Sequence, residues 1–266
     1  MTLAARLRAA VARHGALCVG IDPHPALLSS WGLPADASGA ERMGRAVVEA
    51  AAGRAGVVKP QVALFEAHGA AGLAALERVL ADARAAGLLT IADAKRGDIG
   101  STNLGYAAAW LEPGSPLEAD ALTVSPYLGV GALTGAFEAA ERAGKGLIVL
   151  AATSNPEGEA LQRARLEDGR TVAQAVAEEV AARGAGHGLV IGATVDRAAF
   201  GLTDAVIAAT PVLAPGFGAQ GARLADLDAL FPSDALVLAS ASRSILAAGP
   251  DGVARAIDAA RAELPR

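Results

Sequence analysis

The residue types with the clearest chemical potential in this 266-residue chain lie in the segment IADAKRGD, at positions 91–98. Asp93 and Lys95 are two positions apart, and on a β-strand such side chains share one face. Asp98 follows after Gly97, where the chain can turn sharply. The segment therefore predicts an ammonium group and carboxylates gathered at one site.

Two further ionisable residues, Asp22 and Lys59, end other apolar runs and can join this cluster. Buried ions are costly unless they are paired, and alternating signs keep each group charged. An ammonium held in this way can stabilise a developing carbanion and then protonate it. A carboxylate placed against a substrate carboxylate would destabilise that ground state. The alternative interpretation is a salt-bridge layer with only a structural role.

A second pattern indicates phosphate binding near the end of the chain. Residues 215–221 read PGFGAQG and residues 240–244 read SASRS. Glycines let backbone N–H groups approach an anion, and Arg243 can grip phosphate oxygens with two parallel hydrogen bonds. Two flexible loops with a surface arginine are the alternative. The histidines are scattered and no metal-binding motif is present, so we predict no metal site.

The elements that must position these groups are eight short apolar runs with helix-like segments between them. The strand ends are spaced 21 to 42 residues apart, the size of a strand–helix unit. This indicates an α/β protein with a (β/α)8 (TIM) barrel, whose chemistry lies at the carboxyl ends of the strands. A doubly wound sheet is the alternative, but the first turn reads DPHP rather than a glycine-rich fingerprint. The expected strands are residues 17–22, 56–60, 88–94, 119–124, 146–151, 188–193, 211–214 and 235–240; the expected helices are 41–53, 65–86, 129–143, 171–183, 197–208, 223–229 and 250–264.

Composition narrows the class further. The net charge of −5 argues against sequence-independent binding to nucleic acid, and no apolar run approaches the ~20 residues that span a membrane. The single cysteine, Cys18, cannot form an internal disulfide and fits a reduced core. Residues 1–15 are rich in arginine, like a transit peptide, but their apolar spacing favours an amphipathic helix. We expect one cytoplasmic barrel domain over residues 1–266, beginning with that helix.

Several motifs together resemble the orotidine 5′-phosphate decarboxylase family, and in particular its longer bacterial subgroup. The strongest is DAKRGDIGST at residues 93–102. The others, in order along the chain, are GIDP at 20–23, KP at 59–60, SNP at 154–156, PGFGAQG at 215–221 and SRSI at 242–245. The D-x-K-x-x-D core is shared with metal-dependent relatives, but the ordered set is specific.

The resemblance implies decarboxylation of orotidine 5′-monophosphate to uridine 5′-monophosphate without a metal or organic cofactor. Lys95 is then expected to deliver a proton to the pyrimidine carbon that loses carbon dioxide. Asp93 is expected to face the departing carboxylate. Lys59 would link the aspartates and contact the ribose, and Asp22 would hold a ribose hydroxyl.

The resemblance also implies a homodimer with shared sites. Asp98 and Thr102 match the pair that reaches into the partner's site. Ser154 matches the contact to the pyrimidine ring, with Pro215 packed nearby.

The phosphate is expected to be held by Gln220 and Arg243, and Ser242 stands where many members have glycine. Two alternatives remain open at this point: a metal-assisted sugar-phosphate lyase of the same barrel superfamily, and a non-catalytic phosphate-binding barrel.

Overall fold

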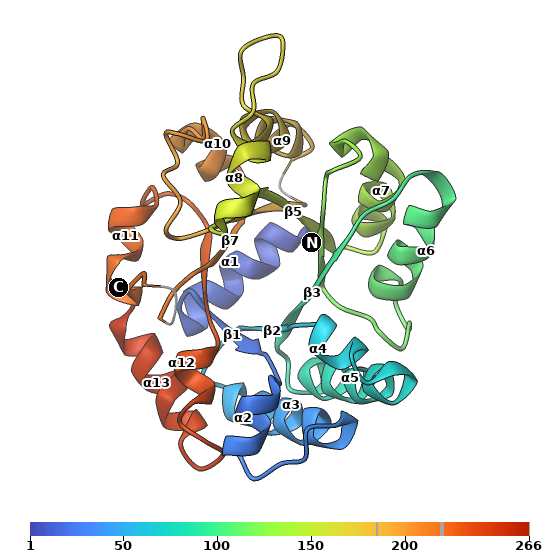
Figure 1. The fold of residues 1–266 in the computed structure, drawn as a ribbon, viewed down its shortest axis with the longest axis vertical. Coiled ribbons are helices and arrows are strands. Elements are labelled where there is room, and N and C mark those ends of the chain that lie inside the picture. Colours follow the sequence, from blue (N-terminus) through green and yellow to red (C-terminus); the bar gives the residue numbers. More distant parts are fainter. Residues whose placement is uncertain (185, 219–220, 266) are drawn as a thin grey trace.

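The computed structural model describes residues 1–184, 186–218 and 221–265. Eight parallel strands close into a barrel in chain order, and β8 pairs with β1 (Figure 1). The predicted TIM barrel is therefore confirmed. The strands are β1 (Leu17–Ile21), β2 (Val57–Pro60), β3 (Leu89–Arg96), β4 (Ala121–Val124), β5 (Gly146–Ala152), β6 (Gly188–Ile191), β7 (Val212–Pro215) and β8 (Val237–Ala241).

Helices surround the barrel in the order expected of strand–helix units (Figure 1). They are α1 (Leu3–His14), α2 (Pro25–Ser30), α3 (Ala37–Ala51), α4 (Ala63–Glu66), α5 (Gly69–Ala85), α6 (Gly100–Leu111), α7 (Thr134–Arg142), α8 (Pro156–Gln162), α9 (Val172–Ala182), α10 (Asp204–Ala209), α11 (Leu227–Leu230), α12 (Arg243–Leu246) and α13 (Val253–Glu263). The sequence pattern does not predict α6, because its first turn holds glycine, serine, threonine and asparagine, which have low helix propensity.

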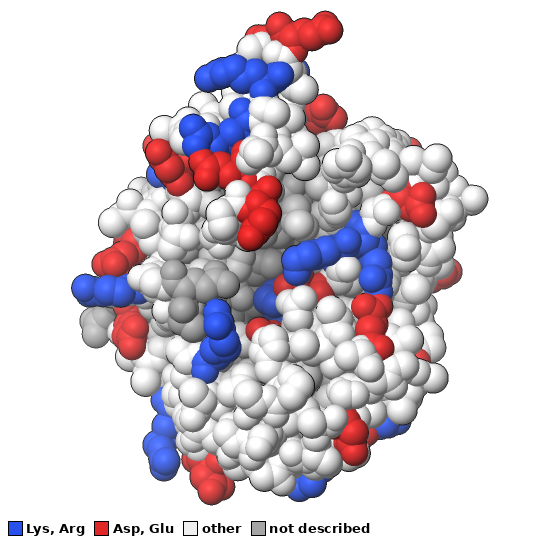
Figure 2. All heavy atoms as spheres, viewed as in Figure 1, with Lys and Arg blue, Asp and Glu red and all other residues white. Residues whose placement is uncertain are grey.

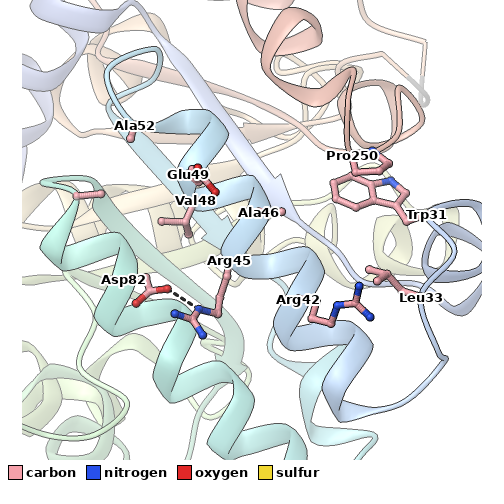
Figure 3. A pocket seen from close by; sticks show the side chains of 11 residues that line it. Trp31, Leu33, Arg42, Arg45, Ala46, Val48, Glu49, Ala52, Asp82 and Pro250 are labelled. Carbon is pink, nitrogen blue, oxygen red and sulfur yellow. Dashed lines mark hydrogen bonds and ion pairs between the residues drawn. The ribbon is translucent and has the colours of Figure 1, made fainter.

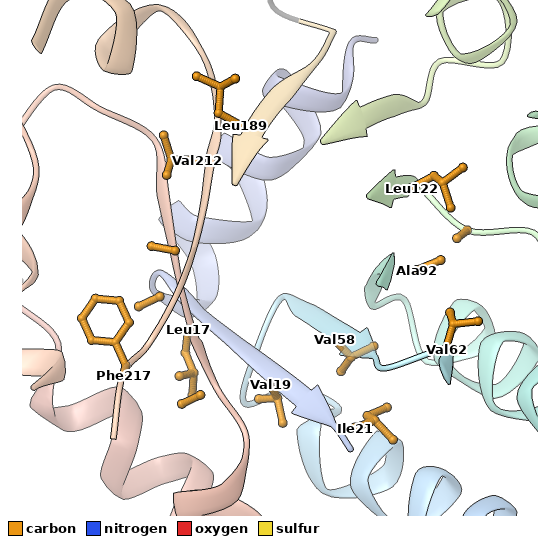
Figure 4. Packing of buried hydrophobic residues seen from close by; sticks show 14 of the residues in the cluster. Leu17, Val19, Ile21, Val58, Val62, Ala92, Leu122, Leu189, Val212 and Phe217 are labelled. Atoms are coloured by element: carbon orange, nitrogen blue, oxygen red, sulfur yellow. The ribbon is translucent and has the colours of Figure 1, made fainter. Parts of the chain in front are cut away.

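One apolar core lies between the barrel wall and the helices. Leu17, Val19 and Ile21 of β1 alternate outward along the strand and are fully buried (Figure 4). Because the helices cover this outer face, the strands read as continuous apolar runs rather than as alternating ones.

A second core fills the barrel interior and is closed at one end by α1. Leu3 and Leu7 of α1 pack with inward residues such as Cys18 and Ile91. Figure 1 shows α1 crossing the centre of the ring of strands. The helix begins at the cap Thr2, whose hydroxyl accepts the Ala5 N–H. With its amino end sealed, the barrel is left with one open end, at the carboxyl ends of the strands.

Within the described ranges, no helix combines the length and the apolar character needed to cross a membrane.

Candidate active site

Strand alternation builds the site directly above the apolar interior. Val57, Ile91 and Ala121 point into the barrel core, as does Leu238. Two positions further along the same strands, a layer of polar side chains replaces the apolar ones. Its members, all buried, are Lys59, Asp93, Thr123 and Ser240.

Three members of this layer, Lys59, Asp93 and Ser240, line an open cavity of about 520 Å3. Figure 2 shows basic side chains around the hollow at the centre of this face, with acidic ones among them. The cavity thus has both signs of charge. Of the predicted site residues, those that line it are Asp22, Lys59, Asp93, Lys95, Ser154, Pro215, Ser242 and Arg243.

Asp93 is the centre of the charge cluster. Its Oδ2 accepts from Lys59 Nζ at 2.7 Å, and its Oδ1 accepts from Lys95 Nζ at 2.6 Å. The side chains of Lys59 and Asp93 are only 7% and 10% exposed, whereas that of Lys95 is 45% exposed. Lys95 is therefore the more accessible of the two cations to a ligand in the cavity.

The lysines control the ionisation of Asp93. Burial by itself would raise the pKa of this carboxyl, but the charges of Lys59 and Lys95 outweigh burial and lower the pKa to about 2. Burial would likewise lower the pKa of Lys59, and the charges of Asp93 and Asp22 outweigh it, so that the pKa lies above its ordinary value. Both groups stay ionised over the physiological range.

The backbone of β3 does not follow the regular alternation that was expected to place Asp93 and Lys95 on one face. The pairing with β4 shifts between Ala92 and Arg96, and Lys95 has a φ of 50°. This is the left-handed region, which residues other than glycine rarely adopt. Asp93 and Lys95 do meet, as expected, but a bulge in the strand brings them together.

The ribose candidate Asp22 and Ser242, which precedes the phosphate candidate Arg243, lie across the joint between β1 and β8. Asp22 Oδ1 and Ser242 Oγ are both buried and have no hydrogen-bond partner among the described residues. A β-carbon on Gly20 would lie 2.5 Å from Ser242 Cβ, so the glycine makes room for this serine. Asp22 and Ser242 also line the cavity.

The expected phosphate end lies beside β7 and β8. Arg243 is exposed on the cavity wall and forms no ion pair with the described residues. Gly216 and Gly218 have φ values of 116° and 74°, which fit a loop that turns back tightly. The predicted phosphate ligand Gln220 lies outside the described residues.

Asp98 and Thr102 do not line the cavity of their own chain. Asp98 Oδ1 accepts the N–H of Ile99, and Thr102 is exposed on α6. Large apolar side chains stand exposed nearby, with Ile99 at 61% and Tyr127 at 77%. One chain alone thus leaves these two predicted site residues outside the pocket.

Ser154 is exposed at the end of β5, directly before α8. None of the residues of α8 is buried. Gln162 instead ties the helix to Thr153, the residue that follows β5, because its Oε1 accepts the Thr153 N–H at 2.9 Å and its Nε2 donates to Thr153 Oγ1 at 2.8 Å. This role of Gln162 is not predictable from the sequence, because a lone polar residue in an exposed segment provides no signal for one.

Gln61 is a further cavity residue that the sequence analysis missed. Its Oε1 lies 3.4 Å from Lys59 Nζ. The spacing of two residues from Lys59 would have indicated a shared face.

A larger hollow of about 740 Å3 lies on the flank of the barrel, along α3 (Figure 3). Two of its charged groups bind each other, with Arg45 Nε 2.7 Å from Asp82 Oδ2. It holds none of the charged residues at the strand ends, so we place the chemistry in the smaller cavity.

The chain is similar to known proteins over most of its length. Residues 15–257 match the model of the family described as Orotidine 5′-phosphate decarboxylase / HUMPS. An orotidine 5′-phosphate decarboxylase of Salinispora tropica is 55% identical over 94% of this chain and 91% of its own. One of Corynebacterium glutamicum is 47% identical over 94% of this chain and 92% of its own.

Solved structures show the same likeness. A crystal structure assigned as an orotidine 5′-phosphate decarboxylase of Streptomyces avermitilis superimposes with a TM-score of 0.94 and 47% identity. The superposition covers 99% of this chain and 94% of the other. The similarity therefore extends over the whole barrel.

Proposed function

Because the chain belongs to the orotidine 5′-phosphate decarboxylase / HUMPS family, we propose that it converts orotidine 5′-monophosphate to uridine 5′-monophosphate in pyrimidine biosynthesis. The observation that carries the proposal is the half-exposed Lys95 ammonium. It is held 2.6 Å from the carboxylate of Asp93, at the wall of a cavity that Arg243 also lines. The site offers a proton donor and an anion grip in one pocket.

The proposed reaction needs only groups of the chain. The bond between the pyrimidine ring and its carboxylate breaks, carbon dioxide leaves, and the electron pair stays on the ring carbon. The ammonium of Lys95 stabilises that developing negative charge and then gives the carbon a proton. Asp93, ionised by its two lysine neighbours, faces the departing carboxylate and disfavours the bound ground state.

The remaining roles concern binding. The Asp22 carboxylate, with a buried oxygen that lacks a described partner, suits a ribose hydroxyl, and Lys59 lies beside it. Arg243 and the backbone of the loop after β7 suit the phosphate. Ser154 and Pro215 line the part of the cavity expected to hold the base. Phosphate binding far from the broken bond supplies energy for orienting the ring.

We also propose that the protein works as a homodimer with shared sites. Asp98 and Thr102 stand outside their own cavity, beside the exposed side chains of Ile99, Tyr127 and Leu128. The outer face of α6 continues this apolar surface through the half-exposed Leu104. A second copy packed here would cover it and would bring Asp98 close to the neighbouring cavity.

Of the alternatives, the metal-assisted sugar-phosphate lyase is the stronger. The description of the matching family names a second group, HUMPS, beside the decarboxylases, so membership of the family alone does not fix the reaction. Full-length relatives of 47–55% identity that carry the decarboxylase name favour decarboxylation. The test is to incubate the purified protein, in excess chelator, with orotidine 5′-monophosphate and to identify the products. We expect uridine 5′-monophosphate and carbon dioxide. Activity only after a divalent metal is added would support the lyase, and nucleotide binding without turnover would support the non-catalytic barrel.

A further inference from the structure

Thr123 lies within β4, next to Asp93 and Lys95 of β3, and none of the roles proposed above includes it. Its side chain is fully buried, at 0% exposure. Its Oγ1 accepts the backbone N–H of Lys95 at 3.0 Å and donates to Asp93 Oδ1, also at 3.0 Å. The hydroxyl thus donates its single hydrogen to the Asp93 carboxylate and accepts the Lys95 N–H with a lone pair.

The pairing of β3 with β4 explains why a hydroxyl is needed here. Ala92 pairs with Leu122 and Arg96 pairs with Val124, so three residues of β3 stand opposite Thr123 alone. In a regular parallel ladder a strand N–H bonds to a carbonyl of the next strand. At this bulge the N–H of Lys95 bonds to the threonine side chain instead. Without the hydroxyl, that N–H would lose its partner within the chain.

The backbone at this point is also strained. Lys95 holds a φ of 50°, which is costly for a residue with a side chain and persists only where neighbouring contacts impose it. One such contact is the hydrogen bond that the Lys95 N–H donates to Thr123 Oγ1. The same hydroxyl donates to the oxygen of Asp93 that receives the lysine ammonium.

We infer that Thr123 is a positioning residue for the decarboxylation. Its hydroxyl fixes the left-handed backbone of Lys95 and the orientation of Asp93, so that ammonium and carboxylate keep their places against the reacting carbon. The inference rests on the proposed function of Lys95 and Asp93. Thr123 itself transfers no proton.

The sharpest test compares Thr123→Ser with Thr123→Ala, because both remove the methyl group and they differ only in the hydroxyl. We expect Thr123→Ser to keep most of the wild-type kcat. Thr123→Ala should lose roughly 100-fold in kcat, the effect of a misplaced reacting group, with little change in KM. A purely structural role would not separate kcat from KM in this way and would not be rescued by serine.

Thr90→Ala is the matched control. Thr90 is a buried threonine on the same strand as Lys95, and its hydroxyl also contacts a carboxylate, that of Asp120, toward the closed end of the barrel. Assayed well below its melting temperature, Thr90→Ala should leave kcat as in the wild type.

Amide hydrogen exchange separates this inference from the proposed function. Exchange at the Lys95 N–H should be faster in Thr123→Ala than in Thr123→Ser or in the wild type, whatever reaction the protein catalyses. Equal exchange in the two variants, or equal kcat values in an active enzyme, would overturn the role of Thr123. A wild-type protein without turnover would instead overturn the decarboxylase proposal, and the exchange result would still decide whether the hydroxyl holds Lys95.

Discussion

Lys59 and Asp93 reach across neighbouring strands of the barrel so that the lysine Nζ lies 2.7 Å from the carboxylate Oδ2. Both side chains are nearly enclosed. Mutual attraction overcomes the cost of burial and displaces both pKa values toward the charged forms. Both groups of the pair therefore stay charged at the floor of the cavity, and the fold depends on this in acid.

The carboxyl of Asp93 has a folded pKa of about 2 against an ordinary value of 3.8. A lowered pKa stabilises the fold fully above pH 3.8, and this contribution is lost as the pH falls toward 2. This contribution can be measured by denaturant unfolding at pH 5 and at pH 2, with Asp93→Asn compared with the wild type. The wild type should lose roughly 2 kcal/mol more free energy of unfolding than the variant. Equal losses of unfolding free energy in the wild type and in Asp93→Asn between pH 5 and pH 2 would show that the Asp93 carboxylate is not paired with the lysines.

Arg243 is exposed and makes no ion pair with the described part of the chain, so its removal should spare the fold. We expect Arg243→Ala to lower kcat/KM by roughly 100-fold, the worth of about two charged hydrogen bonds to phosphate, with an unchanged melting temperature. Orotidine, which lacks the phosphate, is the matched control substrate, and the two proteins should turn it over equally slowly. An equal defect on both substrates would place Arg243 elsewhere than at the phosphate.

The shared-site dimer can be tested by mixing two inactive variants. If Asp98 acts in the neighbouring cavity, a heterodimer of Lys95→Ala and Asp98→Ala contains one site with both wild-type residues. After unfolding and refolding together, the mixture should regain about a quarter of wild-type activity, because half of the dimers are mixed and each has one good site. If Asp98 acts in its own cavity, every site in the mixture lacks one residue and no activity returns.

His187 predicts a second, separate dependence of stability on pH. The ring is fully buried, its Nδ1 accepts the Leu147 N–H, and its Nε2 lies 3.0 Å from Glu141 Oε1. Burial lowers its pKa below the ordinary value of 6.5 and outweighs the raising effect of Glu141. The contribution of the neutral His187 ring to the free energy of unfolding is therefore fully present above pH 6.5. It falls as the pH drops below this value, by at most about 1.4 kcal/mol per pH unit.

Denaturant unfolding between pH 7 and pH 5 measures this slope. His187→Asn keeps an acceptor for the Leu147 N–H but cannot be protonated, so its slope should be smaller than that of the wild type. His24→Asn, at an exposed position, is the control and should keep the wild-type slope. Identical slopes in all three proteins would mean that His187 is not held neutral by burial.

The sequence predicts the barrel well because most strands are largely apolar runs and each ends close to where its run ends. It also predicts which charged residues meet, since residues at the carboxyl ends of parallel strands share one rim. It does not predict the left-handed backbone of Lys95 or the role of Thr123. Those depend on a shift in the pairing of β3 with β4, which a pattern within a single strand does not contain.

Two helices show a related limit. The outer face of α6 is exposed in a single chain and its first residues are weak helix formers, so apolar periodicity gives no signal. Helix α8 buries nothing and is tied to Thr153, the residue that follows β5, through the Gln162 amide, a contact between residues nine positions apart. Polar contacts of this kind become visible only once the fold brings their partners together.

The account rests on the ammonium of Lys95 as the group that stabilises and protonates the reacting carbon. The most direct test is the kcat of purified Lys95→Ala on saturating orotidine 5′-monophosphate in chelator, followed by the loss of the orotate-type ultraviolet absorbance. We predict a loss of at least about 10⁴-fold, because general acid catalysis and electrostatic stabilisation are removed together, while the variant still binds nucleotide. A variant that retains a tenth or more of the wild-type kcat would contradict the account.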